Sequence, residues 1–425
     1  MRISCAAVLG PTLLFLSFVA GQNQRRIGTR HDVSLELHRQ MGSNLGSFSS
    51  GDNFPDLSPV GLVQSLKGFV GTGTLISPTI VVTAGHVLRG SYKAKAPVAS
   101  EWTFLLGSDS LKPTETYSVS EVILHPGWTA RLGYEGGIGD GDVLGLDLAL
   151  LRLGSPVNGV TPARFNTRGS ELIGSRLILA GYGSIADGKR GVTSVDNFDR
   201  LAGENTLDRV VETVNASNVL QDYRGGVLGI DFDSPDEIFN SLGSTSSPID
   251  YLGSGSSAPK PLPYEATTAE GDSGGPAFVR MGDIWKVVGT VSYGTKSSVY
   301  GDVTVYTRIA SQSDWIRSYL ERWAPARRTG FGEWLNLDWL GNFSIYQGNW
   351  VFHEKLGWFY SQGNEADEFW AWQTGIGWWW TSIKAYPYFY AYEHSHWLYF
   401  SDEDSIPSRC RFFNYQINEW EIFEH

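Results

Sequence analysis

The amino-acid sequence predicts an all-β protein, and two patterns carry that prediction. From Val60 onward, short runs of Val, Ile and Leu are separated by Gly, Pro, Ser and Asn, as in 118–124 and 177–181. Such runs with turn residues between them are typical of antiparallel strands. From residue 331 to the end, Trp and Tyr recur in units of about twenty residues, which favours a second, smaller module of stacked β-hairpins. At 425 residues, the chain is long enough for two or three domains.

Charge and cysteine content narrow the class of protein. The formal net charge is −12, and no stripe of Lys and Arg offers contacts to phosphates, so we expect no nucleic-acid partner. The two cysteines are Cys5 and Cys410, and the first falls in the leader described below. We therefore expect one thiol and no internal disulfide in the mature chain.

Residues 1–21 resemble a cleavable export signal. Arg2 precedes an uncharged apolar stretch, and small residues end it at Ala20 and Gly21. A membrane anchor is the alternative, but Pro11 interrupts the run, which is shorter than the roughly twenty residues of a spanning helix. We expect an exported protein with no membrane span after signal removal, which is secreted, periplasmic or at the cell surface. The lack of disulfides suits a bacterial source.

The hexapeptide Gly271–Pro276, with the sequence GDSGGP, indicates a nucleophile site. Glycines allow a tight turn that brings backbone N–H groups close to a reacting carbonyl. Ser273 lies at the centre of this turn. The alternative is an ordinary glycine-rich turn with an exposed serine.

A serine hydroxyl needs a base to take its proton and a third group to orient that base. His86 follows the apolar run 80–82, and Asp147 stands in the apolar segment 146–153. Each fragment alone also fits a structural histidine or a core carboxylate. Together, in the order His, Asp and Ser, the three fragments resemble the signatures of trypsin-like (chymotrypsin-fold) serine endopeptidases.

The resemblance covers about residues 58–323 and implies two six-stranded antiparallel β-barrels with a C-terminal helix. By this resemblance the catalytic residues are His86, Asp147 and Ser273, and they meet in the cleft between the barrels. The backbone N–H groups of Gly271 and Ser273 would form the oxyanion hole. The family's usual disulfide beside the catalytic histidine is absent, because Val87 and about Gly71 occupy those places.

Residues 22–57 are a propeptide or an N-terminal extension. In the resembled family, activation frees a hydrophobic N-terminus whose ammonium pairs with the aspartate before the nucleophile, which here is Asp272. Ile27 after Arg26 is the candidate N-terminus. However, Ile27 lies 32 residues before Pro59, where the first strand is expected, and this distance is longer than the family usually needs. Cleavage at Arg26 and an uncleaved extension both stay open.

By the same resemblance, the substrate-binding pocket beside Ser273 has Thr267 as its floor and Ser292, Tyr293, Gly294 and Thr304 as its walls. Threonine at the floor cannot pair with a basic side chain, and Thr304 would narrow the pocket. We therefore expect small or medium apolar side chains to be preferred, although Glu270 at the rim offers a negative charge.

Two long spacings predict inserted surface loops, since His86 and Asp147 are 61 residues apart and Asp147 and Ser273 are 126 apart. These loops are 131–145 and about 197–257. The second contains the acidic run 231–236, which could hold calcium or lie solvated. Because no EF-hand spacing is present, we favour the solvated loop and expect neither a metal site nor a cofactor.

The expected domain ends with a predicted amphipathic helix over 311–323, followed by a linker over 324–330. Residues 331–425 then hold 11 of the 16 tryptophans, with 13 acidic residues against 4 basic ones. This module resembles aromatic repeats of bacterial exported proteins, some of which bind cell-wall polymers. Its rings suit sugar faces or choline-like cations. Alternatively, they form only the core of a small sheet.

Two function classes follow from these observations. The first is an exported serine endopeptidase with a C-terminal binding or targeting module, whose partners are a protein or peptide substrate and a cell-wall or glycan ligand. The second is a catalytically inactive, protease-like binding or adhesion protein of the cell surface. We favour the enzyme because His86, Asp147, Gly271 and Ser273 are all present. A Gly-x-Ser-x-Gly hydrolase is excluded because its order is Ser, acid, His.

Overall fold

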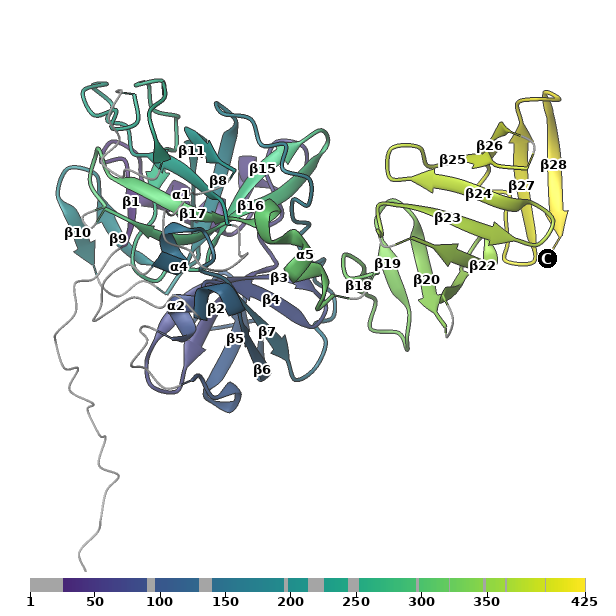
Figure 1. Cartoon of the computed structure of the whole chain (residues 1–425), viewed down its shortest axis with the longest axis horizontal. Helices are drawn as coiled ribbons and strands as arrows, with labels where there is room; N and C mark the ends of the chain where they lie inside the picture. Colours follow the sequence, from purple (N-terminus) through teal and green to yellow (C-terminus); the bar gives the residue numbers. More distant parts are fainter. Residues whose placement is uncertain are drawn as a thin grey trace, which may run out of the picture.

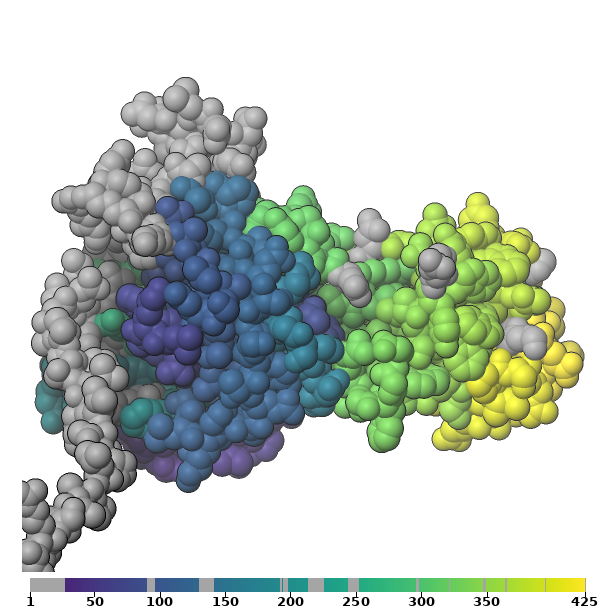
Figure 2. All heavy atoms as spheres, turned by 90° about the horizontal axis from the view of Figure 1, so that it is seen from below, coloured from purple at the N-terminus to yellow at the C-terminus, as the bar shows by residue number. Residues whose placement is uncertain are grey.

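The structure, a computed structural model, is mostly β and consists of two lobes that lie side by side (Figure 1). It describes residues 26–89, 96–129, 140–194, 198–212, 225–243, 252–295, 298–320, 322–346, 349–363, 365–393 and 395–424. Figure 2 shows the C-terminal lobe in contact with one side of the larger lobe. The expected leader, residues 1–21, lies outside the described residues. Within the described residues, no helix is both long and apolar enough to cross a membrane.

The first half of the large lobe is a closed barrel of six antiparallel strands. In barrel order these are β2 (Val60–Ser65), β3 (Val70–Ser77), β4 (Ile80–Thr83), β7 (Ala149–Leu153), β6 (Glu115–Leu124) and β5 (Trp102–Leu106). Its interior is packed with buried apolar side chains, among them Val63, Leu75, Val81, Phe104 and Leu151. Burial of these side chains is the main force that holds the barrel closed.

The second half is a seven-stranded antiparallel sheet. Its order is β11 (Leu201–Thr206), β8 (Arg176–Gly181), β15 (Pro276–Met281), β16 (Ile284–Gly294), β17 (Val303–Arg308), β13 (Val227–Asp231) and β12 (Arg209–Val211). The predicted all-β class is confirmed, and the second barrel takes the form of a sheet whose strand pairing stays open within the described residues. The prediction of a surface loop over 197–257 was wrong, because β11, β12 and β13 lie within it.

The N-terminal extension packs onto the large lobe. Strand β1 (Arg26–Thr29) lies between β9 (Ser184–Asp187) and β14 (Ala266–Thr267), and β10 (Gly191–Ser194) completes this four-stranded sheet. Helix α1 (Leu35–Gly42) begins at Ser34, whose hydroxyl accepts from the N–H of Glu36, and the short helix η1 (Gly46–Phe48) follows. Met41, Phe48, Phe54 and Leu57 are buried in a cluster shared with strands of both halves. Residues 27–57 therefore contribute to the core of the lobe.

The remaining helices of the large lobe are short: α2 (Gly85–Leu88), η2 (Ala99–Glu101), α3 (Pro126–Thr129), α4 (Asp140–Val143), η4 (Ile309–Gln312) and α5 (Ser313–Arg317). The predicted helix over 311–323 is shorter than expected. Beyond Arg317 the chain turns, and Trp323 packs in the core of the C-terminal lobe instead of on the large lobe. The helical spacing between Trp315 and Trp323 therefore does not mark one face of a helix.

The C-terminal lobe is one antiparallel sheet of eleven strands in sequence order: β18 (Arg327–Arg328), β19 (Leu335–Leu337), β20 (Gly341–Ile345), β21 (Trp350–His353), β22 (Gly357–Gln362), β23 (Glu368–Gln373), β24 (Gly377–Ser382), β25 (Tyr388–Ala391), β26 (His396–Phe400), β27 (Arg409–Asn414) and β28 (Glu419–Glu424). The segment expected to be a linker carries its first strand. Each strand pairs with the next one along the chain, as in a series of hairpins. Within a strand, successive side chains point to opposite faces of the sheet.

The two faces of this sheet differ in their aromatic residues. One face packs a core of phenylalanines with Trp379, Leu398 and the buried thiol of Cys410. Burial raises the pKa of that thiol to about 12, so it is a structural group and not a reactive one. The other face leaves rings exposed, including Trp350, Trp358, Trp370, Trp372, Tyr392, Trp397 and Trp420. The interpretation that these rings form only a core was therefore wrong, and binding by the exposed rings stays a prediction.

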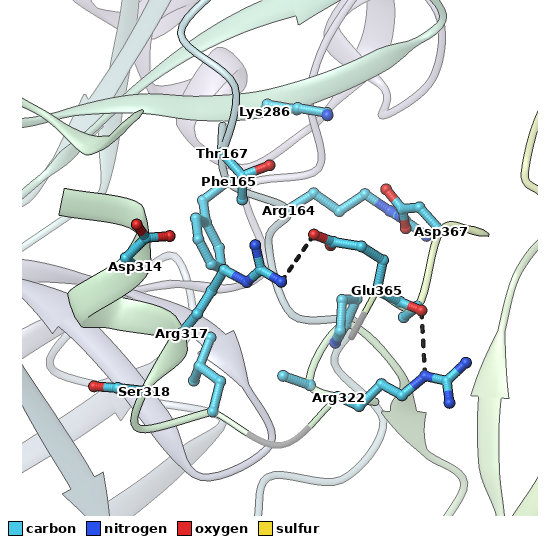
Figure 3. Close-up of a pocket in the computed structure, with 14 residues that line it drawn as sticks. Arg164, Phe165, Thr167, Lys286, Asp314, Arg317, Ser318, Arg322, Glu365 and Asp367 are labelled. Carbon is cyan, nitrogen blue, oxygen red and sulfur yellow. Dashed lines mark hydrogen bonds and ion pairs between the residues drawn. The ribbon is translucent and has the colours of Figure 1, made fainter. Parts of the chain in front are cut away.

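Ion pairs join the two lobes around a cavity of about 530 Å³ (Figure 3). Arg317 pairs with Glu365 at 3.0 Å, and Arg164 pairs with Asp367. The guanidinium of Arg322 donates to the Ser361 hydroxyl at 2.9 Å and lies over the Trp323 ring, 4.6 Å from its centroid. These contacts fix the C-terminal sheet against the large lobe.

The acidic run 231–236 is not the solvated loop that the sequence suggested. Asp231 and Asp233 are buried beside Asp208 and Glu265 in the second sheet. Burial and the neighbouring carboxyls raise the pKa of Asp208 to about 9, and burial with the charges of Asp231 and Glu265 raises that of Asp233 to about 8. Burial also raises the pKa of Glu265 to about 8. Among the described residues, no group of three or more His, Cys, Asp and Glu has the arrangement of a metal site.

These carboxyls make stability depend on pH. Because their pKa values are higher in the folded than in the unfolded chain, they bind protons on folding, and the free energy of unfolding falls as the pH rises from about 4 to about 9.

Asp208→Asn keeps the shape of the side chain and adds a hydrogen-bond donor without the charge. We expect the variant to melt about 5 °C or more above the wild type at pH 9 and within about 2 °C of it at pH 5. Asp236→Asn alters an exposed carboxylate of the acidic run 231–236. It should leave the melting temperatures at pH 5 and pH 9 unchanged in scanning calorimetry. If Asp208→Asn melts no higher than the wild type at pH 9, the charge of Asp208 does not lower the stability of the folded protein.

Candidate active site

His86 lies in α2, directly after strand β4 of the first barrel. Its Nδ1 lies 2.6 Å from Oδ2 of Asp147, and its Nε2 lies 2.8 Å from Oγ of Ser273. An ionised carboxylate only accepts hydrogen bonds, so Nδ1 carries the proton and Nε2 is free to accept from the serine hydroxyl. The structure therefore brings together the three residues that the sequence proposed as catalytic.

Asp147 is fully buried, two residues before strand β7 and between the two halves of the lobe. Its Oδ1 accepts from the backbone N–H of His86 at 2.9 Å, and its Oδ2 also accepts from the hydroxyl of Ser292 at 2.6 Å. The hydroxyl of Thr307 donates to its backbone carbonyl at 3.0 Å. These donors stabilise a negative charge away from water and fix the carboxylate beside the imidazole.

Ser273 lies on a tight turn before strand β15. Gly271 and Gly274 have φ angles of +92° and +82°, in the left-handed region that glycine adopts without strain. A Cβ on Gly274 would lie 2.1 Å from Oγ1 of Thr83, so the turn also needs glycine for its close approach to the first barrel. The Ser273 carbonyl accepts from the N–H of Thr72 at 2.8 Å. The sequence motif is therefore explained by backbone geometry.

Asp272 is buried behind this turn. Its carboxylate accepts from the backbone N–H groups of Gly183 at 2.8 Å and Ala269 at 2.9 Å. Burial raises its pKa well above the usual value, against the effect of these two donors. Ile27, the residue expected to supply an ammonium after cleavage, is fully buried inside strand β1, where it pairs with Ile185 of β9.

The five residues predicted to form the substrate pocket line one cavity beside Ser273: Thr267, Ser292, Tyr293, Gly294 and Thr304. The hydroxyl of Thr304 lies 3.0 Å from that of Thr267 and 2.9 Å from that of Thr268. The remaining volume is about 20 Å³, little more than the room for one water molecule. Threonine side chains thus fill most of the pocket.

Sequence reasoning missed two contributors to the site. Ser292 was expected as a pocket wall, yet its hydroxyl bonds to Asp147, which lies on the other half of the lobe. Thr72 was not singled out, yet it contacts the nucleophile turn from strand β3. Both contacts are long-range, and no local motif around either residue signals them.

Comparisons with known proteins agree with this geometry. Residues 71–289 match the family model described as trypsin-like peptidase domain, a span that contains His86, Asp147 and Ser273. The chain is 27% identical to vitamin K-dependent protein C of Rattus norvegicus over 61% of its own length, and 26% identical to that of Mus musculus. It is 28% identical to granzyme M of Rattus norvegicus, over 62% of its own length and 84% of the relative. The chain spans about half the length of the protein C relatives, at 48%.

Proposed function

The chain belongs to the family of trypsin-like peptidase domains, and on that premise we propose that it is a serine endopeptidase. The observation that carries the proposal is the unbroken hydrogen-bond chain from Asp147 through His86 to Ser273. The buried carboxylate at one end and the accessible hydroxyl at the other are the arrangement that activates a serine for attack on a carbonyl.

In the proposed mechanism, Nε2 of His86 removes the Ser273 hydroxyl proton as Oγ attacks the peptide carbonyl, and it then gives the proton to the leaving amine. Asp147 holds the imidazole in the required tautomer and stabilises the imidazolium. The backbone N–H groups of Gly271 and Ser273 bind the oxyanion. Water then releases the acyl group from Ser273 by the same steps in reverse order.

The alternative, an inactive protease-like binding or adhesion protein, is less well supported. Such a protein has no need to keep the imidazole between the carboxylate and the hydroxyl, with hydrogen bonds of 2.6 and 2.8 Å. The labelling experiment below separates the two functions.

The pocket supports a preference for small side chains at the residue before the cleaved bond. The Thr267 floor offers no negative charge for Arg or Lys, and Thr304 fills the space that a large side chain needs. Asp302 also lines the pocket, but its carboxylate is buried and accepts from the N–H of Val299 at 3.1 Å. Glu270 is exposed at the turn and not inside the pocket. The proposed substrate is therefore a protein or peptide with a small apolar residue at this position.

We also propose that the protein is exported, with residues 1–21 as the leader, residues 22–57 as an extension that packs onto the peptidase domain of residues 58–323, and residues 331–425 as a binding module. The connection 324–330 includes the first strand of the module's sheet, β18. The leader-like sequence supports export, and the two cysteines, one of them in the leader, suit a bacterial source. The product would be secreted, periplasmic or held at the cell surface.

For the C-terminal module we propose binding to a cell-wall polysaccharide. Strand register places the exposed Trp370 opposite Trp380, which in turn is opposite Tyr390, so that exposed and half-buried rings continue from strand to strand. Neighbouring rings meet edge to face, as Trp380 and Trp397 do at 6.3 Å, so such contacts hold rings in place before a ligand arrives. The module carries 13 acidic and 4 basic residues, which favours glycans without phosphate or sulfate groups.

The first test is active-site labelling. The wild type should be phosphonylated at Ser273 by a serine-directed fluorophosphonate and should hydrolyse peptides. Ser273→Ala should lose the label and about 10⁴-fold or more of kcat, because no other group can form the acyl intermediate. Ser50→Ala, at an exposed site, serves as the control and should retain both. A folded wild type that neither reacts nor cuts would support the inactive alternative.

The second test concerns specificity. A peptide library should show cleavage after Ala, Ser or Val. Thr304→Gly should raise kcat/KM for Leu or Phe about tenfold or more relative to Ala, since each added methylene in a pocket is worth about 1–3 kcal/mol. Thr304→Ser keeps the hydroxyl and should change the ranking little. Preference of the wild type for Arg or Lys would refute the proposed pocket.

The third test concerns the module. Full-length Ser273→Ala protein should sediment with insoluble peptidoglycan, and the further double change Trp370→Ala/Trp397→Ala should reduce the bound fraction about tenfold, because stacked rings supply the contact. Leu111→Ala, which removes an exposed apolar side chain from the large lobe, is the control and should bind as its parent does. Equal sedimentation of all three proteins would show that the aromatic face is not the binding surface.

A further inference from the structure

We propose that Thr72 is a positioning residue that holds the oxyanion turn in its catalytic form, and that the chain is active without cleavage before Ile27. The inference rests on the proposed peptidase function. It concerns the turn Ala269–Asp272, which is closed by a hydrogen bond of 3.0 Å from the N–H of Asp272 to the carbonyl of Ala269. Gly271 occupies the third position with φ of +92°, as in a type II turn.

Thr72 joins this turn to two other backbone segments. Its hydroxyl donates to the carbonyl of Gly271 at 2.8 Å and accepts from the N–H of Tyr182 at 3.1 Å. Its own N–H donates to the carbonyl of Ser273 at 2.8 Å. The residue is fully buried and lies on β3, so a rigid barrel strand holds the carbonyls on both sides of Asp272.

A second contact sets the direction of the oxyanion donor. The carbonyl of Glu270 accepts from the N–H of Ser184 at 3.1 Å. In a trans peptide the N–H and C=O groups point in opposite directions, so this bond turns the N–H of Gly271 away from strand β9. The donor that would bind the oxyanion is therefore oriented before substrate arrives, which is what electrostatic stabilisation requires.

Strand β1, which pairs with the strand of Ser184, contains the bond between Arg26 and Ile27. In β1, Arg26 is paired with Ser184 and Ile27 with Ile185, in a parallel register with β9. The Asp272 carboxylate already accepts two backbone hydrogen bonds, from Gly183 and Ala269. The hydrogen bonds that close the turn thus involve no ammonium group of Ile27, and cleavage after Arg26 would remove one paired residue from β1.

The experiment has two arms, both on the full-length protein. In the first, Arg25→Gln/Arg26→Gln removes the basic residues before Ile27, and intact mass confirms that this bond is uncut. Peptide hydrolysis and fluorophosphonate labelling should stay within about twofold of the wild type. Activity that depends on a new N-terminus at Ile27, in the wild type or in the variant, would overturn the proposal.

In the second arm, Thr72→Val removes the hydroxyl at nearly constant volume. We expect kcat to fall about 10- to 100-fold, less than the roughly 100- to 1,000-fold cost of removing one oxyanion donor outright, because the donor is misplaced and not lost. KM should stay within about twofold, and Thr72→Ser should recover the activity. Thr74→Val is the matched control, because Thr74 is buried on the same strand and its hydroxyl has no partner among the described residues. An unchanged kcat in Thr72→Val, or an equal loss in Thr74→Val, would overturn the role of Thr72. A wild type without activity would instead refute the peptidase function itself.

Discussion

The site depends on the burial of one charge, the carboxylate of Asp147, at the junction of the two halves of the large lobe. A buried carboxylate is costly unless donors surround it. Here the donors are the Nδ1–H and backbone N–H of His86 and the hydroxyl of Ser292. His86 comes from the first barrel and Ser292 from the second sheet, so the requirement to satisfy this charge also fixes how the two halves meet. The position of the catalytic imidazole follows from that fit.

Further polar contacts hold the same junction between the two halves. Thr72 and Thr83 of the first barrel contact the nucleophile turn, and Thr307 of the second sheet donates to the Asp147 carbonyl. Buried hydrogen bonds of this kind specify position more than they add stability, since each contributes only about 0.5–1.5 kcal/mol net. The described residues thus align the site through hydrogen bonds between the two halves.

Sequence reasoning was most successful where function imposes a local pattern. The all-β class follows from strand-length apolar runs, and His86, Asp147 and Ser273 stand in short motifs that the family resemblance identifies. It failed where the cause is tertiary. Strand β11 was hidden because it buries Glu204 and Asn205, whose polar side chains interrupt the apolar pattern. The helix after Ser311 was predicted to be too long, because Trp323 was assigned to its apolar face. In the structure, Trp323 packs in the core of the C-terminal lobe. The contacts of Thr72 and Ser292 join segments more than a hundred residues apart, and no local signal records them.

The aromatic module shows why composition alone left its role open. Alternation along each strand sends Phe343, Phe359 and Phe389 into a core and sends Trp358, Trp370 and Trp397 outward, so one sequence pattern provides both a stable sheet and an exposed face. Arg317 and Arg164 then pair with Glu365 and Asp367, while Trp323 enters the module's core. Because hydrophobic and charged contacts both cross this boundary, the aromatic face keeps a fixed direction relative to the catalytic cleft. A polymer bound on that face would hold the peptidase in one orientation above it, and that orientation would decide which neighbouring proteins come within reach of Ser273.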